Sequence, residues 1–181
     1  WATSQMIPTG NNIQPPEDFT DATLRQVIRV NRDGDTYRLR LSNLFGTAPL
    51  TIETVRLARA LKAGTSGIDT ATTVKVLFNG RDTVTIPAGA ELLSDAIAFT
   101  ADDQMDIAIT MYVPQPPAVE TSHPGSRANS YLVHGRHVDK ADLPAAKTFA
   151  HWFFITSLEV QAAPTTKAIV TFGDSDRKIG V

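Results

Sequence analysis

The stretch that decides the fold is YRLRLS (37–42), in which apolar and polar residues alternate. A period of two is typical of a β-strand that buries one face and exposes the other. Residues 105–113 repeat the pattern, with an apolar side chain at every second position. The alternation predicts two half-buried strands, and it places Arg38 and Arg40 on a solvated or carboxylate-paired outer face.

Other β-rich runs extend this pattern in both directions. They cover 23–30, 50–58, 96–100, 128–133 and 148–160, and the runs 74–78 and 83–86 flank Asn79-Gly80. Asn-Gly favours a type I′ turn, because both central residues must accept positive φ, so these two runs are predicted to pair as a hairpin. The helix-compatible stretch 54–63 begins with β-branched residues. We therefore expect a mainly β fold: an antiparallel, jelly-roll-like β-sandwich over about 18–160, with 4–19 as an irregular lead-in.

Composition excludes several classes of function. Seventeen Lys and Arg against nineteen Asp and Glu leave a formal charge of -2 over 181 residues, so no basic field attracts nucleic acid. The apolar runs are too short to span a bilayer. The absence of cysteine excludes disulfides, thiolate zinc sites and cysteine nucleophiles. The first residue is Trp1 and not Met, which indicates a removed signal peptide, a removed tag or unobserved residues, and among these we favour a secreted or periplasmic protein.

The character of the sequence changes after residue 162. A short linker, AAPTT (162–166), precedes the apolar run AIVTF (168–172), which does not alternate and suits a strand buried on both faces of a parallel α/β sheet. The run ends in Gly173-Asp174-Ser175, which would place Ser175 at the carboxyl edge of such a sheet. The alternative is a turn in which Asp174 and Ser175 cap a helix. We divide the chain into a β-sandwich domain at 1–162 and the start of a second domain at 163–181.

The string KAIVTFGDS (167–175) resembles the first sequence block of SGNH (GDSL-type) hydrolases, in which an apolar strand ends in F-G-D-S. The resemblance extends over nearly the whole chain before Ser175, to the β-rich N-terminal region of one branch of these enzymes. The segments that carry it are TLRQVIRV (23–30), YRLRLSNLFGTAPLTI (37–52), VTIPAGAELLSD (84–95), HPGSRANSYLVHGRHV (123–138) and FAHWFFITSLEV (149–160).

The resemblance implies a serine ester hydrolase that needs no cofactor or metal and acts on acyl groups of carbohydrates, lipids or small esters. It assigns Ser175 as the catalytic nucleophile, with its own backbone N–H as one oxyanion donor. The family's other donors, a Gly and an Asn, and its Asp-x-x-His pair have no counterpart here, and residues 176–181 depart from the family's continuation. The implied partner is therefore the remainder of the hydrolase domain, as further residues or as a second chain. A chain that ends at 181 is expected to be inactive.

Four other features have competing interpretations. Glu120 and His123 have acid-x-x-His spacing but precede the serine, so a plain loop is the expected structure. His134 and His137, with Asp139 nearby, suggest a metal site, although residues three apart on a strand point to opposite faces. The consecutive aromatic residues 152–154 could form a sugar-stacking platform, yet they must point to both faces, which favours interface packing. SNLFG (42–46) is expected to be a tight structural turn anchored by Phe45.

The function keeps an alternative of a different class. The sandwich could be a non-catalytic binding or interaction module, for example for carbohydrate, with the GDS tripeptide incidental.

Overall fold

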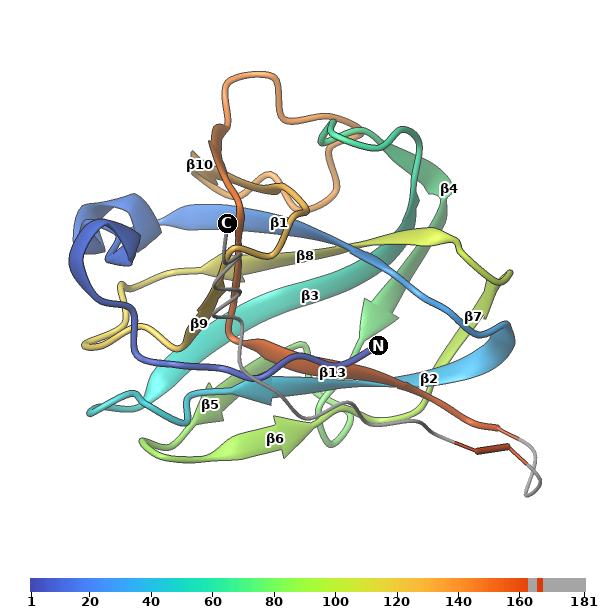
Figure 1. Cartoon of the computed structure of the whole chain (residues 1–181), viewed down its shortest axis with the longest axis horizontal. Coiled ribbons are helices and arrows are strands. Elements are labelled where there is room, and N and C mark those ends of the chain that lie inside the picture. Colours follow the sequence, from blue (N-terminus) through green and yellow to red (C-terminus); the bar gives the residue numbers. More distant parts are fainter. Residues whose placement is uncertain (163–165, 168–181) are drawn as a thin grey trace, which may run out of the picture.

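The computed structural model describes residues 1–162 and 166–167, which form the predicted β-sandwich (Figure 1). Every strand pairing is antiparallel. The largest sheet has the order β11-β10-β1-β8-β3-β4, with β5 also on β3, and the sheet that faces it has the order β13-β2-β6, with β7 also on β2. β12 and β9 form a separate two-stranded sheet. The elements are η1 (Gly10–Asn12), η2 (Pro16–Phe19), β1 (Ala22–Arg29), β2 (Gly34–Ser42), β3 (Leu50–Ala60), β4 (Ile68–Val76), β5 (Thr83–Ile86), β6 (Glu91–Leu93), β7 (Ile97–Ala101), β8 (Asp106–Val113), β9 (Ser122–Pro124), β10 (Ser130–His134), β11 (Lys147–Phe149), β12 (His151–Phe153) and β13 (Ile155–Val160).

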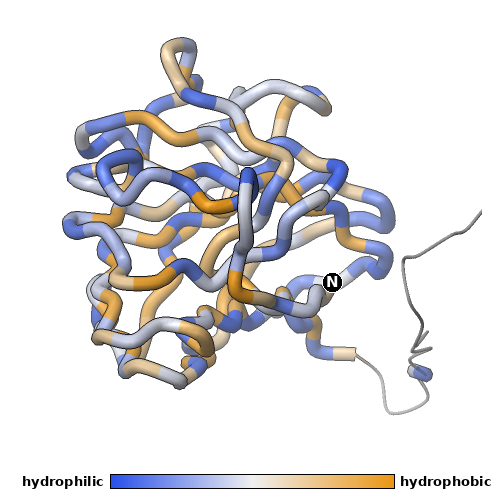
Figure 2. The backbone as a smooth tube through the Cα atoms, turned by 60° about the vertical axis from the view of Figure 1, so that its left-hand side comes forward, coloured by the Kyte–Doolittle hydropathy of each residue, from blue (hydrophilic) through white to orange (hydrophobic). Residues whose placement is uncertain are grey.

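The core lies between the two sheets and is built from the alternating residues of the sequence. Tyr37, Leu39 and Leu41 of β2 are buried, whereas Arg38 between them is exposed. Figure 2 shows hydrophobic and hydrophilic residues alternating along the chain. Burial of each such side chain contributes about 1.5–3 kcal/mol, so the two-residue period of β2 specifies which face of the strand packs inward.

The centre of the larger sheet departs from a simple half-buried pattern. Residues of β1 and β8 on the outer face, including Arg25 and Thr110, are as buried as those facing the core. The loop before β4 and the loop that follows β10 cover this face, with the backbone N–H of Ile68 donating to the carbonyl of Ala141 at 2.8 Å. Around Arg25 and Thr110 the outer face of the sheet is therefore packed under these loops and not exposed to solvent.

The Asn79-Gly80 turn has the predicted conformation, but the predicted hairpin beyond it is wrong. Asn79 and Gly80 have φ of 54° and 76°, and Phe78 and Arg81 exchange backbone hydrogen bonds of 2.9 and 3.1 Å. Beyond that pair, β4 and β5 both pair with β3 and lie end to end along it. β3 is eleven residues long and can therefore pair with both. Thr54, with φ of 53°, marks the junction between the two ladders.

The predicted strand at 148–160 is divided into β11, β12 and β13. The division comes at Ala150 and at Phe154, whose φ is 59°. This left-handed residue breaks the alternation of side chains, so that Phe153 and Phe154 are both fully buried. Both rings meet Phe19 edge to face, at centroid distances of 5.1 and 5.5 Å. The expected interface packing of these two aromatic residues is thus core packing.

The SNLFG turn is structural, as predicted, and Asn43 is its centre. The Asn43 amide donates to the carbonyl oxygens of Ala48, Ile86 and Pro87 at 2.9 to 3.2 Å. A Cβ atom added to Gly46 would lie 1.8 Å from Oδ1 of Asn43, so this position accepts only glycine. Phe45 is only half-buried, and its backbone N–H donates to the Thr121 hydroxyl at 3.0 Å.

The remaining expectations concern the lead-in, the helix-compatible stretch 54–63, membrane spans and the strand at 168–172. The lead-in is irregular apart from η1 and η2, as expected, while the helix-compatible stretch 54–63 is the second half of β3 and a loop. No helix within residues 1–162 and 166–167 has the length and apolar character needed to cross a bilayer. The predicted strand at 168–172 lies outside the described residues.

Candidate functional site

Ser175 lies outside the described residues, together with Gly173 and Asp174. The predicted nucleophile therefore has no geometry to report. The candidate sites within the described residues are the histidines and two surface pockets.

The histidines are held by the sandwich itself. Ring nitrogens of His123 and His134 lie 2.6 and 2.9 Å from the backbone carbonyls of Ser4 and Thr20. His151 contacts the Asn12 side chain at 3.3 Å, and burial, followed by the charge of His123, lowers its pKa. These contacts tie three of the four imidazoles to the lead-in and to the residue that caps η2, and none of the three is hydrogen-bonded to a carboxylate among the described residues.

Neither histidine site suggested by the sequence is assembled. Glu120 accepts a hydrogen bond from the Gln14 backbone at 2.7 Å and makes none with His123 among the described residues. Asp139 lies 3.5 Å from Arg56, and the part of the chain that the structure describes contains no cluster of three metal-ligating side chains. Neither motif is the plain loop that the sequence suggests, because His123 lies within β9 and His134 is the last residue of β10, while His137 lies in the loop that follows.

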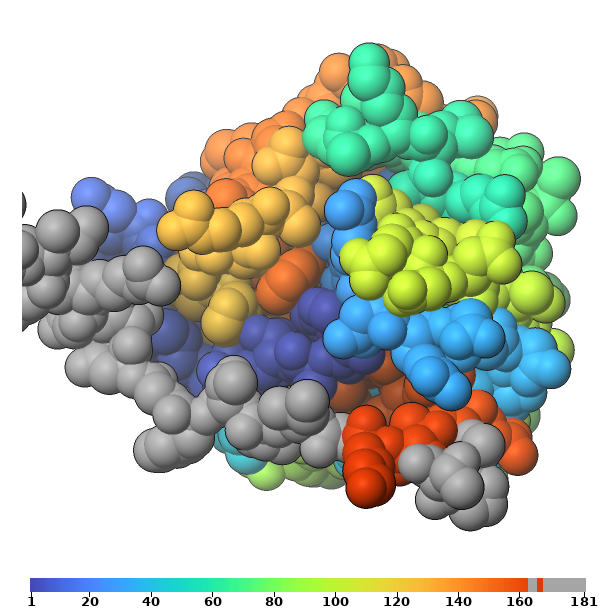
Figure 3. All heavy atoms as spheres, turned by 45° about the vertical axis from the view of Figure 1, so that its right-hand side comes forward, coloured from blue at the N-terminus to red at the C-terminus, as the bar shows by residue number. Residues whose placement is uncertain are grey.

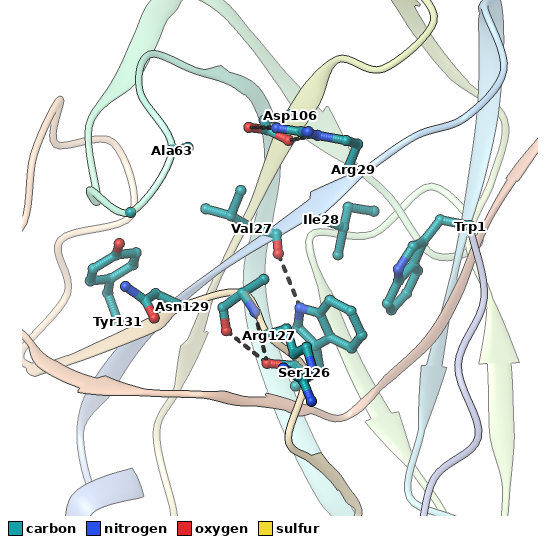
Figure 4. A pocket seen from close by; sticks show the side chains of 13 residues that line it. Trp1, Val27, Ile28, Arg29, Ala63, Asp106, Ser126, Arg127, Asn129 and Tyr131 are labelled. Atoms are coloured by element: carbon teal, nitrogen blue, oxygen red, sulfur yellow. Dashed lines mark hydrogen bonds and ion pairs between the residues drawn. The ribbon is translucent and has the colours of Figure 1, made fainter. Parts of the chain in front are cut away.

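One pocket is a groove of about 480 Å³, which we call the indole groove. It is hollowed between the 61–66 loop, the 123–129 segment and the first residues of the chain (Figure 3). Its lining comes from β1, β8, β10, β12, two loops and the lead-in (Figure 4), and consists of Trp1, Val27, Ile28, Arg29, Ala63, Gly64, Asp106, Ser126, Arg127, Ala128, Asn129, Tyr131 and Trp152.

Two half-exposed tryptophans form the apolar part of the groove. The Trp1 and Trp152 rings meet edge to face, 4.7 Å apart at 83°. Trp152 is fixed by a hydrogen bond from Nε1 to the carbonyl of Val27 at 3.0 Å and by His123, which stacks on it at 5.7 Å and 23°. Trp1 is held by its backbone, which pairs with Leu158 on the edge of β13. The groove thus presents aromatic rings whose positions are set by the framework.

Charged and amide groups lie on the other side of the groove. Arg29 makes two hydrogen bonds with the Asp106 carboxylate, at 2.8 and 2.9 Å, in a two-pronged geometry (Figure 4). The hydrogen bond with Asp106 raises the pKa of Arg29. Arg127 is exposed and makes no ion pair within residues 1–162 and 166–167, and the Asn129 amide lies nearby. The groove therefore carries one net positive charge in a protein whose formal charge is -2.

Tyr131 adds a polar atom that lacks a partner. Its side chain is 6% exposed, and its hydroxyl is buried without a hydrogen-bond partner among the described residues. In Figure 4 the hydroxyl points towards the loop that carries Ala63. Buried hydroxyls are normally hydrogen-bonded, to protein or to an ordered water molecule, so this hydroxyl marks a polar point behind the groove wall.

A second, smaller pocket of about 250 Å³ surrounds Glu120. Its walls are the lead-in and the segment before β9, and they are almost entirely apolar: Ile7, Pro8, Ile13, Gln14, Pro16, Phe19, Pro117, Ala118, Val119 and Glu120. Oε2 of Glu120 is buried without a partner within the described part of the chain. Burial in these apolar surroundings raises the pKa of Glu120 to about 7.

Glu120 should make stability depend on pH. Its pKa is raised in the folded protein from an ordinary 4.5 to about 7, so the folded state binds the proton more tightly. The stabilisation is complete below pH 4.5 and is lost as the pH rises to about 7. Relative to Glu120→Gln, the wild-type protein should lose on the order of 2–3 kcal/mol of unfolding free energy between pH 4.5 and 8. Urea unfolding at both pH values measures this difference.

The exposed Glu17 in η2 provides the control for this prediction. Glu17→Gln should leave the pH dependence of the wild-type protein in place. A wild-type profile that runs parallel to that of Glu120→Gln across this range would show that Glu120 is ionised normally in the folded protein.

The groove was not predicted from the sequence. Of the residues that line it, only Trp152 belongs to the stretch 152–154 that the sequence suggests as a sugar-stacking platform. The other lining residues come from segments that are distant in the chain. The available sequence signal is the polar and aromatic string GSRANSY (125–131). Its residues 126–129 and Tyr131 line the groove.

No protein-family model matches this chain, and no curated protein matches it either.

Proposed function

We propose that this chain is the N-terminal portion of a serine ester hydrolase of the SGNH type, which cleaves carboxylic esters with Ser175 as nucleophile. The observation that carries the proposal is the apolar run ending in F-G-D-S (172–175). In the sequence this run follows a domain whose segments resemble the N-terminal region of one branch of that family. The β-sandwich fold is consistent with that region. The partner is the remainder of the hydrolase domain, and the substrate class is carboxylic esters, among which esters of carbohydrates are candidates.

The chemistry requires a general base close to Ser175. The Ser175 hydroxyl would attack the ester carbonyl carbon while a general base takes its proton, and the alcohol would leave with that proton. Water would then release the acid from the acyl-enzyme. The histidines of the sandwich that contact backbone carbonyls or Asn12 are occupied in holding the fold. The resemblance assigns the base, the Asp-x-x-His pair, and most oxyanion donors to the remainder of the hydrolase domain.

Labelling with a fluorophosphonate tests this proposal, because the reagent phosphonylates an activated serine. In a protein extended through the hydrolase domain, or mixed with the chain that supplies it, we expect one adduct on Ser175, located by peptide mass spectrometry. The 181-residue chain alone should remain unlabelled, because an unactivated serine hydroxyl is a weak nucleophile at neutral pH. Absence of an adduct in the extended protein would favour the non-catalytic binding module. An adduct in the 181-residue chain would mean that a base exists within it.

A further inference from the structure

We propose that the indole groove is a glycan-binding site that accepts sugar rings stacked against its tryptophans. The site is independent of Ser175 and goes beyond the proposed hydrolase function. Its volume of about 480 Å³ lies within the ~300–1,000 Å³ typical of small-molecule sites.

The apolar half of the groove matches the apolar face of a sugar. A pyranose ring presents a face of C–H groups, which packs well on the electron-rich face of an indole. Trp1 and Trp152 are both partly exposed at the groove and are fixed by the Val27 carbonyl and by pairing with Leu158. Because the rings are already ordered, a ligand loses little additional side-chain entropy when it stacks on them.

The polar half matches the rim of a sugar. Neighbouring hydroxyl groups act as both donors and acceptors, so they need a paired donor and acceptor at fixed spacing. Arg29 and Asp106, joined at 2.8 and 2.9 Å, supply that pair, and the Asn129 amide adds one group of each kind.

The charges of the groove argue against other occupants. An apolar protein surface docked here would bury the Arg29–Asp106 pair, and desolvation of such a pair costs several kcal/mol. A nucleic acid would require more than the single net positive charge of this groove. Arg127, which has no ion-pair partner among the described residues, would favour a sugar acid over a neutral sugar.

Intrinsic fluorescence provides a selective test. The chain contains two tryptophans, and both line the groove, so every change in tryptophan emission reports on it. The probes are cellohexaose, xylohexaose, chitohexaose and hexagalacturonate, titrated into the 181-residue chain. We expect a saturable change with a Kd below about 1 mM for at least one probe.

Variants that keep both tryptophans retain the fluorescence signal while they change other residues of the groove. Asp106→Asn should weaken binding at least ~10-fold, because it removes charge-assisted hydrogen bonds. Arg40→Ala is the control: this arginine also pairs with a carboxylate, that of Glu159, but lies outside the groove, so its Kd should equal that of the wild-type protein. Arg127→Ala should weaken hexagalacturonate more than the neutral probes. Calorimetry with Trp152→Ala should show loss of binding.

Two results would overturn the proposal. The first is the absence of a saturable change with all four probes. The second is binding that Asp106→Asn and Trp152→Ala leave unchanged, which would place the sugar elsewhere. If the probes fail and extension of the chain through the hydrolase domain alters tryptophan emission, the groove is a domain interface. Ser175→Ala should leave the Kd unchanged, so failure of the hydrolase proposal and failure of this one are distinguishable.

Discussion

Replacement of Ser175 by alanine, in a protein that contains the whole hydrolase domain, should lower kcat/KM for p-nitrophenyl acetate by at least about four orders of magnitude. Loss of the nucleophile removes the acyl-enzyme route, and only binding and the oxyanion donors remain to assist attack by water. The free energy of unfolding of the sandwich should not change, because Ser175 lies beyond the residues that form it. Initial rates and urea unfolding measure the two quantities.

Ser126→Ala is the matched control for this substitution. Ser126 lines the indole groove, and its hydroxyl donates to the Ala128 carbonyl at 2.7 Å. The small acetate ester should not require the groove, so this variant should hydrolyse it at the wild-type rate. If Ser175→Ala retained a tenth or more of the wild-type kcat/KM, another nucleophile would have to carry the reaction.

The sequence predicted the sandwich because the rule that specifies it is local. In β2, alternation of apolar residues with Arg38 and Arg40 directly encodes one buried and one exposed face. Asn79 and Gly80 similarly encode their own positive φ values, which the structure confirms. Local rules also explain why the predicted strand positions are largely correct while the one predicted pairing, 74–78 with 83–86, is wrong. Which edge β4 and β5 occupy depends on the length of β3 and its junction at Thr54, and neither run encodes that information.

The groove could not be predicted for the same reason. Trp1 and Trp152 are 151 positions apart in the chain. They meet only because Ala2, next to Trp1, pairs with Ser157 of β13 while β12 pairs with β9. The pairing of Arg29 with Asp106 requires the antiparallel register of β1 and β8. Ser175 is the opposite case: its short motif predicts a role from sequence alone, and the described residues leave that prediction untested.

Arg25 also could not be foreseen, because a strand position with a charged residue predicts an exposed side chain. The structure buries this guanidinium completely, on the outer face of β1. It donates to the carbonyls of Ser66 and Lys140 at 2.6 and 2.7 Å and to the Thr110 hydroxyl at 2.9 Å. Burial lowers the pKa of Arg25 to about 10, and the nearby Asp142 partly opposes that change, so the group stays charged at neutral pH. One side chain thus joins two loops to the sheet.

Replacement of Arg25 by methionine should lower the free energy of unfolding by about 3–4 kcal/mol, measured by urea denaturation at pH 7. A buried ion pair can often be exchanged for apolar residues at little cost, because both charges leave together. The main partners of Arg25 are backbone carbonyls, which remain in the protein when the charge is removed. Each of these carbonyls therefore loses its hydrogen-bond donor in Arg25→Met. Arg29→Met tests the same exchange four residues along β1, at an exposed pair with Asp106, and should change the unfolding midpoint far less. Equal unfolding midpoints for the two variants would contradict this prediction. They would mean that apolar contacts hold the loops over β1 and β8, and that the hydrogen bonds of Arg25 only balance the free-energy cost of burying its charge.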